Sequence, residues 1–205
     1  MPRIPAVPES AAGLFGRLAY RYARRRFGAV PEPFAVLRHH RKIFWASAVA
    51  ETAYDKACTV LPARVRELAV YRTATTVGCS WCVNFGTMLQ RLDGLDVDRL
   101  QHIDDYATHP LFDDRERLAL AYADAMTAQP MTVTDELVER VRAHVDDAEL
   151  VELTYLVALE NLRARTNHAL GLTAQGYTSG DACPLPFDEQ IRRADSGSGP
   201  APVRG

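Results

Sequence analysis

The chain has 205 residues, of which 47% are hydrophobic and 24% are charged, and its formal net charge is −2. This length and composition suit one globular domain with tails, which can bury a core without the help of disulfides. The small negative charge argues against nucleic-acid binding through counterion release, and no apolar run reaches the roughly 18 residues that a membrane span needs.

Both ends of the chain are expected to be irregular. Residues 1–9 are rich in proline, and the last eleven residues, from Asp195, combine glycine, serine and proline with little to bury. Because the N-terminus has no long apolar segment, we expect no signal peptide and a cytoplasmic protein. The expected division is an N-terminal extension with one helix (1–30), a helical domain (31–180) and a C-terminal tail (181–205), largely disordered from about 195.

In the first half of the domain, apolar spacing predicts four helices and no strand. The first covers residues 10–27, and the second runs from Pro33 to about Ala57. The third begins at Pro62, because proline suits a first helical turn, and ends near Gly78. The fourth runs from Cys79 to about Leu92. Four arginines of the first helix are expected to form a solvated face: Arg21, Arg24, Arg25 and Arg26.

In the second half of the domain, apolar spacing predicts one short helix, over residues 98–106, and three longer ones. The first of the longer helices begins at Asp113 or Asp114 and ends at Pro130. The second begins at Thr134. The last covers about residues 148–170, with Asp146 before it and Gly171 after it. The residues expected on the inner faces are Leu118, Ala121, Tyr122, Ala125, Met126, Leu150, Leu153, Leu156, Val157 and Leu162.

The motif Cys79-Ser80-Trp81-Cys82 stands at the start of the fourth predicted helix. Its two sulfurs lie one helical turn apart, so they can close a small disulfide or hold one metal ion. The unpaired amides and the dipole of a helix N-terminus favour a thiolate, and cysteines of such motifs have pKa values of about 3.5–7.5. Such a thiolate can attack a peroxide or a disulfide, after which the second cysteine closes the pair.

A zinc site, a thioredoxin-like domain and a pair of plain core cysteines are the alternatives to a redox pair in this fold. A structural zinc site needs two more ligands, but Cys58, Cys183 and the six histidines form no second pair with zinc-like spacing. A thioredoxin-like domain needs strands around the motif, where the sequence predicts helices. Plain core cysteines are the remaining alternative. We therefore expect no metal and no cofactor.

Glu67 lies one predicted helix upstream of the cysteine pair. A buried carboxylate near Cys82 could accept its proton, directly or through water. A surface or capping glutamate is the alternative interpretation.

The stretch from Arg66-Glu67-Leu68 to Cys82-Val83-Asn84-Phe85-Gly86 resembles the core of the carboxymuconolactone decarboxylase and AhpD-like alkylhydroperoxidase superfamily, including the separation of Glu67 from the motif. Four later segments resemble the second half of longer members: residues 117–127, 133–135, 149–154 and 160–167. The resemblance therefore covers roughly residues 34–177. The resemblance implies an all-α, AhpD-like helical bundle that forms homo-oligomers through its apolar helix faces.

The same resemblance implies an activity and its site residues. The protein would be a CxxC-dependent peroxidase of the peroxiredoxin type, or a thiol-disulfide oxidoreductase. Cys82 would be the attacking thiol, Cys79 the resolving thiol, and Glu67 part of the proton relay. The implied partners are a small-molecule hydroperoxide and a dithiol or thioredoxin-like electron donor, with no nucleic acid and no membrane.

Two positions depart from the family pattern. AhpD-type motifs carry one histidine between the cysteines and another four residues after the second, where this chain has Trp81 and Gly86. Imidazole is the natural proton shuttle near neutral pH, so its loss weakens the case for efficient peroxidase turnover. Tyr71, Asn84 or a water molecule are the candidates to replace it.

Two other functions are kept as alternatives. One is a carboxymuconolactone decarboxylase-like lyase that acts on a small carboxylated lactone, with Glu67 as base and Arg163 as anion clamp. The other is a non-catalytic redox sensor, which the missing histidines favour. Glu160, Arg163 and Asn167 share one face of the last helix by their i, i+3 and i+7 spacing. We expect them to form a buried polar network that fixes the bundle, in preference to a substrate-anion or subunit-interface site.

Overall fold

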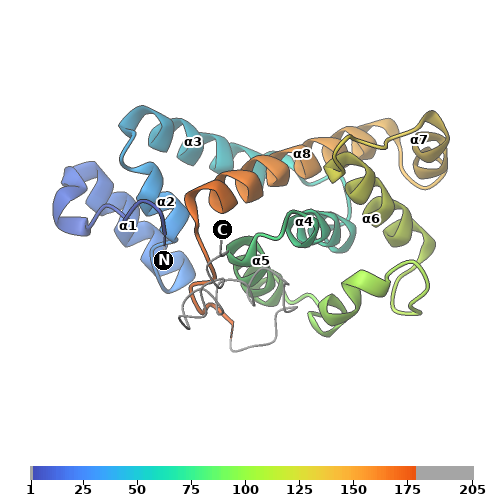
Figure 1. Ribbon diagram of the computed structural model, residues 1–205, viewed down its shortest axis with the longest axis horizontal. Coiled ribbons are helices and arrows are strands. Elements are labelled where there is room, and N and C mark those ends of the chain that lie inside the picture. The colour runs from blue at the N-terminus through green and yellow to red at the C-terminus, as the bar shows by residue number, and fades with distance from the viewer. Residues whose placement is uncertain (1, 179–205) are drawn as a thin grey trace, which may run out of the picture.

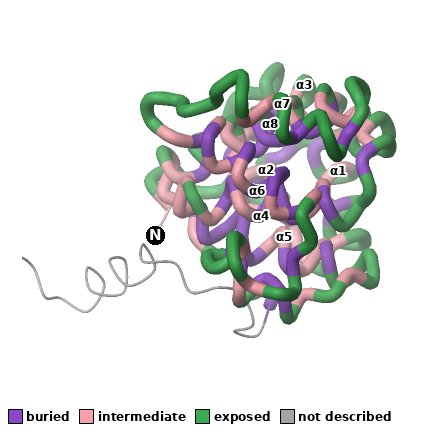
Figure 2. Tube along the Cα trace, turned by 90° about the vertical axis from the view of Figure 1, so that its right-hand side faces the viewer, coloured by how far each residue is buried: buried purple, intermediate pink, exposed green. Residues whose placement is uncertain are grey.

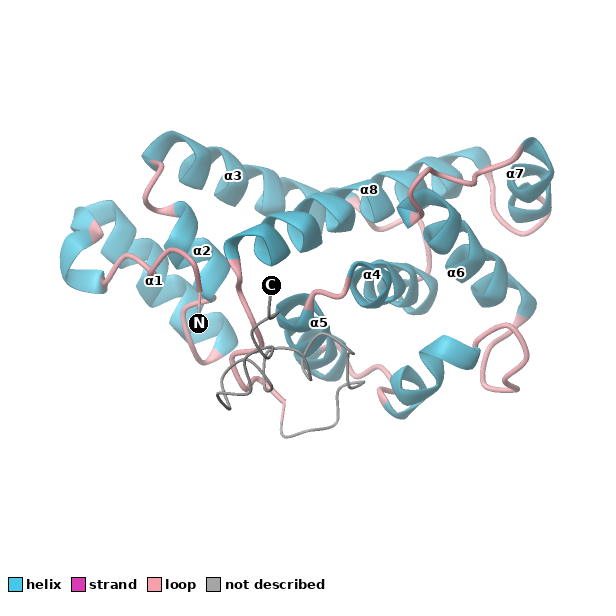
Figure 3. Ribbon diagram, in the orientation of Figure 1, coloured by secondary structure: helices cyan, strands magenta, loops and turns pink. Residues whose placement is uncertain are grey.

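The computed structural model describes residues 2–178, and within that range its regular elements are all helices (Figures 1 and 3). The predicted all-α class is therefore confirmed. The predicted tail, residues 181–205, lies outside the described residues. The elements in chain order are a 3-10 turn at Glu9–Ala11, α1 (Gly13–Phe27), α2 (Glu32–Leu37), α3 (Arg41–Ala57), α4 (Ala63–Val77), α5 (Ser80–Leu92), a 3-10 helix at Asp98–Asp105, α6 (Asp114–Thr127), α7 (Asp135–Arg142) and α8 (Asp147–Leu170).

The helices are arranged around α4, which contacts α5, α6 and α8. Helices α3 and α8 run along one side of the molecule, α1 and α2 lie at one end, and α6 and α7 lie at the other (Figure 1). Buried residues gather in the middle of the fold, and exposed residues surround them (Figure 2). One core cluster lies between α4, α6, α7 and α8, and a second lies around α4 and α5 and contains both motif cysteines.

Capping residues set several helix boundaries as the sequence predicts. Asp113 and Asp146 each form a capping box, in which the N-cap aspartate and a glutamate three residues later satisfy each other's backbone N–H groups. Thr134 accepts a hydrogen bond from the Leu137 N–H at the start of α7. These contacts satisfy donors that a helix N-terminus otherwise leaves unpaired.

The single helix expected from Pro33 to Ala57 is wrong, because the chain turns between α2 and α3. The imidazole Nδ1 of His40 accepts the Ile43 N–H at 3.2 Å and starts α3 anew. Just before it, the buried Arg38 guanidinium donates to the Ala12 carbonyl at 2.6 Å. This long-range bond ties the turn to the N-terminal segment and has no signature in local helical periodicity.

Leu162 was also expected on the inner face of α8, but its side chain is 64% exposed. Among the buried positions of α8, Val157, Glu160, Ala164 and Asn167 follow one another at intervals of three and four. Leu162 lies between two members of that series and so points outward. Two polar residues occupy the inner face that the prediction assigned to leucine.

Glu116 provides a test of what holds one end of the fold together. Its fully buried carboxylate accepts from Arg99 at 2.9 Å and from the Asp113 N–H at 2.9 Å, and it also pairs with Arg64. Glu116→Ala would leave the buried Arg99 guanidinium without its anion, so we expect the free energy of unfolding to fall by about 3–5 kcal/mol.

Urea unfolding of the Glu116→Ala variant measures this loss. Glu139→Ala is the matched control, because Glu139 is a highly exposed partner of Arg142 and its loss should cost less than about 1 kcal/mol. Equal effects of the two substitutions would contradict the assignment.

Candidate functional site

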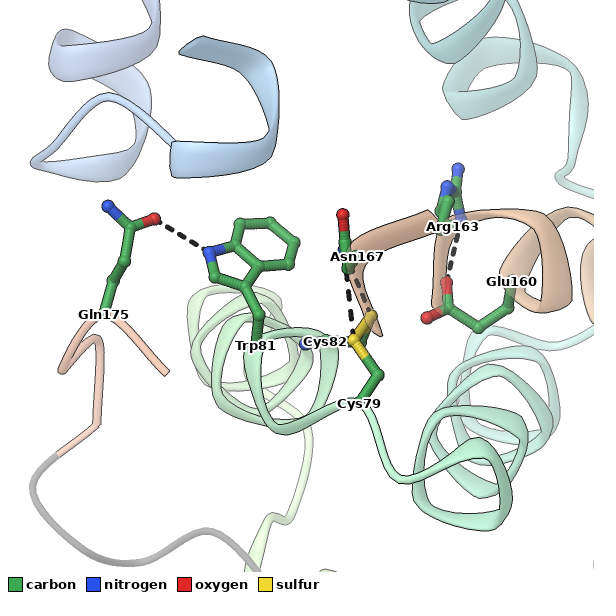
Figure 4. The surroundings of a disulfide bond; sticks show 7 residues. All are labelled: Cys79, Trp81, Cys82, Glu160, Arg163, Asn167 and Gln175. Atoms are coloured by element: carbon green, nitrogen blue, oxygen red, sulfur yellow. Dashed lines mark hydrogen bonds and ion pairs between the residues drawn. A yellow bond between two sulfur atoms is a disulfide. The ribbon is translucent and has the colours of Figure 1, made fainter. Parts of the chain in front are cut away.

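The cysteine pair lies at the N-terminus of α5, as predicted, and the two sulfurs are joined in a disulfide (Figure 4). Cys79 is the N-cap residue, and its Sγ accepts the backbone N–H of Cys82 at 3.2 Å. Gly78 precedes it with a φ of 80°, a left-handed conformation that ends α4 and turns the chain into the motif. The sequence thus places a sulfur directly at the amide end of a helix.

Both cysteines are buried, but unequally. Cys79 is 2% exposed and Cys82 is 8% exposed. They belong to a core cluster that also contains Leu68, Tyr71 and Trp81. A buried thiolate is costly unless hydrogen-bond donors replace the lost water, so the groups around the two sulfurs decide what this pair can do.

One side-chain donor reaches the sulfurs from another helix. The amide Nδ2 of Asn167, on α8, lies 3.4 Å from Cys82 Sγ and 3.9 Å from Cys79 Sγ (Figure 4). Asn167 is only 4% exposed. Sequence reasoning placed this residue in a structural network and missed its contact with the disulfide. Its spacing from Glu160 was the available signal, because it put Asn167 on the buried face of α8.

Trp81 does not take over the role of the missing imidazole. Its indole Nε1–H donates to Gln175 Oε1 at 2.8 Å, on the side of the ring that faces away from the sulfurs (Figure 4). The same Gln175 oxygen accepts the backbone N–H of Glu32, at the start of α2. Trp81 also stacks on Phe85, with 4.6 Å between ring centroids. The residue between the cysteines therefore ties the motif to α2 and to the segment after α8.

Asn84 and Tyr71, the two side chains expected as replacement proton relays, have different surroundings in the structure. Asn84 is engaged elsewhere, since its Oδ1 accepts the Tyr177 N–H at 2.9 Å and its Nδ2 donates to Thr178. Tyr71 is fully buried in the cysteine cluster, and its ring lies 3.7 Å from where a Cβ on Gly86 would be. Tyr71 thus belongs to the same core cluster as the cysteines.

Glu67 lies on α4, one helical turn before Tyr71, and is only partly exposed. It forms an ion pair with Arg66 at 3.1 Å, and in the described residues no hydrogen bond joins it to either sulfur. Burial raises the pKa of Glu67, while the bond to Arg66 acts in the opposite direction. A carboxyl group of this kind can hold a proton closer to neutral pH than an exposed one can.

The polar network expected on α8 is present, and it also includes α3. Arg163 donates to Glu160 at 3.3 Å and, through Nε and Nη2, to both carboxylate oxygens of Glu51. Glu160 is 4% exposed, and burial raises its pKa to about 7, against the pull of Arg163. The negative charges of Glu51 and Glu67 act in the same direction as burial. An acid that titrates near neutral pH therefore lies on the same face of α8 as Asn167.

The described residues offer little for the other classes of site that were weighed. Between residues 2 and 178, no three histidine, cysteine, aspartate or glutamate side chains are grouped so that they could hold a metal ion. None of the helices in that range has both the length and the apolar composition of a membrane span. In the basic cluster of α1, Arg24 pairs with Glu9 and Arg26 with Asp55, all on the exposed surface.

Glu160 makes stability depend on pH in a defined direction. Since its pKa is about 7 in the folded protein and 4.5 is its ordinary value, the folded state holds a proton between these pH values that the unfolded state releases. This contribution is complete below about pH 4.5 and is lost as the pH rises through about 7. Glu160→Gln should abolish this loss, which we expect to be on the order of 2–3 kcal/mol.

Urea unfolding of wild-type and Glu160→Gln proteins at about pH 5 and about pH 8 tests this. Comparing the two proteins cancels the titration of the groups that do not interact with Glu160. The same change in stability between the two pH values in both proteins would show that Glu160 does not titrate in this way.

Known proteins were compared with the chain by sequence. No known family profile matches it. The protein YnjA of Escherichia coli K12, which is described as uncharacterized, is 37% identical over 153 residues, which make up 75% of this chain and 84% of YnjA.

Solved structures give the second comparison. The debrominase Bmp8 in its apo form superposes with a TM-score of 0.74 at 16% identity, covering 85% of this chain and 92% of Bmp8. A cysteine-to-alanine variant of Bmp8 in complex with 2,3,4-tribromopyrrole gives the same TM-score. A peroxidase-related protein from Ralstonia eutropha JMP134, with an alkylhydroperoxidase AhpD core, gives 0.71 at 22% identity, covering 86% of this chain and 94% of that protein.

Proposed function

Because this chain belongs to the family of YnjA and has the fold of the AhpD-like superfamily, we propose that it is a CxxC-dependent oxidoreductase that reduces organic hydroperoxides. The observation that carries the proposal is the closed Cys79–Cys82 pair at the start of α5. Both sulfurs come from the first turn of one helix, so the pair is placed to alternate between dithiol and disulfide.

In the proposed cycle, the Cys82 thiolate attacks the terminal oxygen of the hydroperoxide. The O–O bond breaks, Cys82 becomes a sulfenic acid, and the alkoxide takes up a proton to leave as an alcohol. The Cys79 thiol then attacks the Cys82 sulfur, which forms the disulfide and releases water. The greater exposure of Cys82 supports its role as the attacking thiol, and Glu67, whose pKa is raised, would relay protons from α4.

The proposed partners follow from this cycle and from the surface. An external dithiol, or a thioredoxin-like protein in a reducing cytoplasm, would return the disulfide to two thiols and become oxidised itself. A second copy of the chain is the other proposed partner. Large apolar side chains stand exposed on α1 and α3: Leu14, Phe15, Leu18, Tyr22, Trp45 and Val49. Exposed apolar side chains on adjacent helical turns are typical of surfaces that protein association covers.

Cysteine substitutions test the assignment of roles. We expect Cys82→Ser to abolish the consumption of cumene hydroperoxide in the presence of dithiothreitol. Cys79→Ser should still react once with the hydroperoxide and accumulate a sulfenic acid at Cys82, which dimedone traps. Cys58→Ser is the matched control, because Cys58 is not part of the disulfide and should be dispensable. Full activity of Cys82→Ser would refute the proposed chemistry.

Reductive dehalogenation is the second candidate function. A debrominase has the same fold, and aromatic rings gather beside the motif in this chain, where Phe85 contacts Trp81, Tyr177 and Phe27. Such a reaction would use the same dithiol, which would become the disulfide while a carbon–bromine bond is replaced by carbon–hydrogen and bromide leaves.

A direct comparison of the two substrates separates these functions. We expect the reduced protein to be oxidised by cumene hydroperoxide at least about tenfold faster than by 2,3,4-tribromopyrrole, a ratio equivalent to about 1.4 kcal/mol in the activation barrier. Stopped-flow measurement of thiol loss gives both rates. Faster oxidation by the bromopyrrole, with release of bromide, would favour the dehalogenase.

A further inference from the structure

The family pattern places histidines beside the reduced cysteines, and this chain has none at those two positions. Neither Trp81 nor Gly86 can supply an imidazole, and the Trp81 N–H is bonded to Gln175. A thiolate at Cys82 is nevertheless needed for attack, in a position that is only 8% exposed. Some fixed donor must therefore replace the lost water, because a buried anion without hydrogen bonds is strongly disfavoured.

The two sulfurs share the Asn167 donor, and Cys79 has a backbone donor as well. Cys79 Sγ accepts the backbone N–H of Cys82 at 3.2 Å, as an N-cap residue does. Cys82 Sγ has the Asn167 amide at 3.4 Å, within the range of hydrogen bonds to sulfur. The Asn167 amide is closer to Cys82 than to Cys79, from which it is 3.9 Å away.

The position of Asn167 is held firmly by its own helix. It lies in the last turn of α8, where its carbonyl accepts the Leu172 N–H at 2.9 Å and Gly171 ends the helix with a φ of 67°. Both Asn167 and Leu172 are buried. The backbone that carries the amide is therefore fixed and the side chain is buried, and a fixed donor is what electrostatic stabilisation of a developing charge requires.

The charged neighbours on α8 are already engaged. Arg163, one turn before Asn167, is bonded to Glu51 and Glu160. Glu160 in turn is influenced by Glu67 on α4, which pairs with Arg66. Asn167 is thus the side-chain donor on this face that reaches the sulfur, and an amide keeps its N–H groups at every pH at which the thiol titrates.

We propose that Asn167 is a catalytic residue of the redox cycle, whose side-chain N–H donates to the Cys82 thiolate. It stabilises the negative charge of the thiolate in place of an imidazole, but it does not itself gain or lose a proton. This inference rests on the proposed function and adds a residue to it. When an external dithiol reduces the disulfide, the S–S bond takes two electrons, the donor closes its own disulfide, and one of the two protons released by the donor binds Cys79. The other leaves to solvent, and Cys82 remains a thiolate on the Asn167 amide.

Titration of the reduced protein tests this without any peroxide. Asn167→Leu removes the donor at similar volume and should raise the pKa of the Cys82 thiol by about one pH unit or more, since hydrogen bonds to charged groups are strong. The thiolate fraction near neutral pH should fall about tenfold. Thiolate ultraviolet absorbance and the rate of iodoacetamide alkylation report the change, followed against pH in a background with both Cys58 and Cys183 replaced by serine.

Two further variants make the result specific. Asn167→Asp has nearly the same shape and places a negative charge beside the sulfur, so it should raise the pKa at least as much and keeps the test open if the leucine variant fails to fold. Asn161→Leu is the matched control on α8, because the Asn161 amide bonds to Thr127 and the Val157 carbonyl, not to the cysteines. Its thiol titration should match that of the parent protein.

The outcomes separate this inference from the proposed function. Unchanged thiol titration in folded Asn167→Leu and Asn167→Asp would overturn the role of Asn167, whatever the peroxidase assay shows. A shifted titration would support that role even if no hydroperoxide were consumed, in which case the peroxidase proposal alone would fail. Equal shifts in the Asn161 control would assign the effect to general loosening of α8 and would also overturn the inference.

Discussion

The buried polar face of α8 is the constraint on which the rest of the structure depends. Four of its residues lie within about a quarter of the helix circumference: Glu152, Glu160, Arg163 and Asn167. Each buried polar group needs a partner; Glu160 pairs with Arg163 on α8 itself, and the other three reach different parts of the fold. Glu152 accepts the Val60 and Leu61 N–H groups between α3 and α4, Arg163 binds Glu51 on α3, and Asn167 contacts the disulfide. A rotation or slip of α8 would break all of these contacts together.

This constraint explains how a site made of few residues can be well ordered. The cysteines come from the start of α5, but their environment comes from α4 and α8, which pack against each other in the core. Asn167 lies at the end of α8 nearest the motif, and Glu160 lies two turns away on the same face. The helix therefore presents a neutral donor to the sulfur and keeps its charged pair at a distance, where burial holds the Glu160 pKa near neutral.

Local sequence signals were enough to predict much of this fold. The aspartate caps at Asp113 and Asp146 and the cysteine at the N-cap of α5 act within one turn of the chain, so spacing alone reveals them. The break before α3 depends on Arg38 reaching Ala12, a contact across 26 positions. The contact of Asn167 with Cys82 spans 85 positions, and no local pattern reports it. Sequence thus indicated the cysteine pair as the candidate site, and packing determined which residues of other helices meet it.

The position of Trp81 between the cysteines has an optical consequence. A disulfide beside an indole quenches its fluorescence more strongly than two thiols do, so the emission of Trp81 should report the oxidation state of the pair. The chain has only two tryptophans, and Trp45 lies partly exposed on α3, where it supplies a steady background. Replacing Trp45 by phenylalanine would leave one intrinsic probe inside the motif, stacked on Phe85 and bonded to Gln175. Trp81 stands where the family pattern has a histidine, and its fluorescence would report whether the cysteine pair is oxidised or reduced.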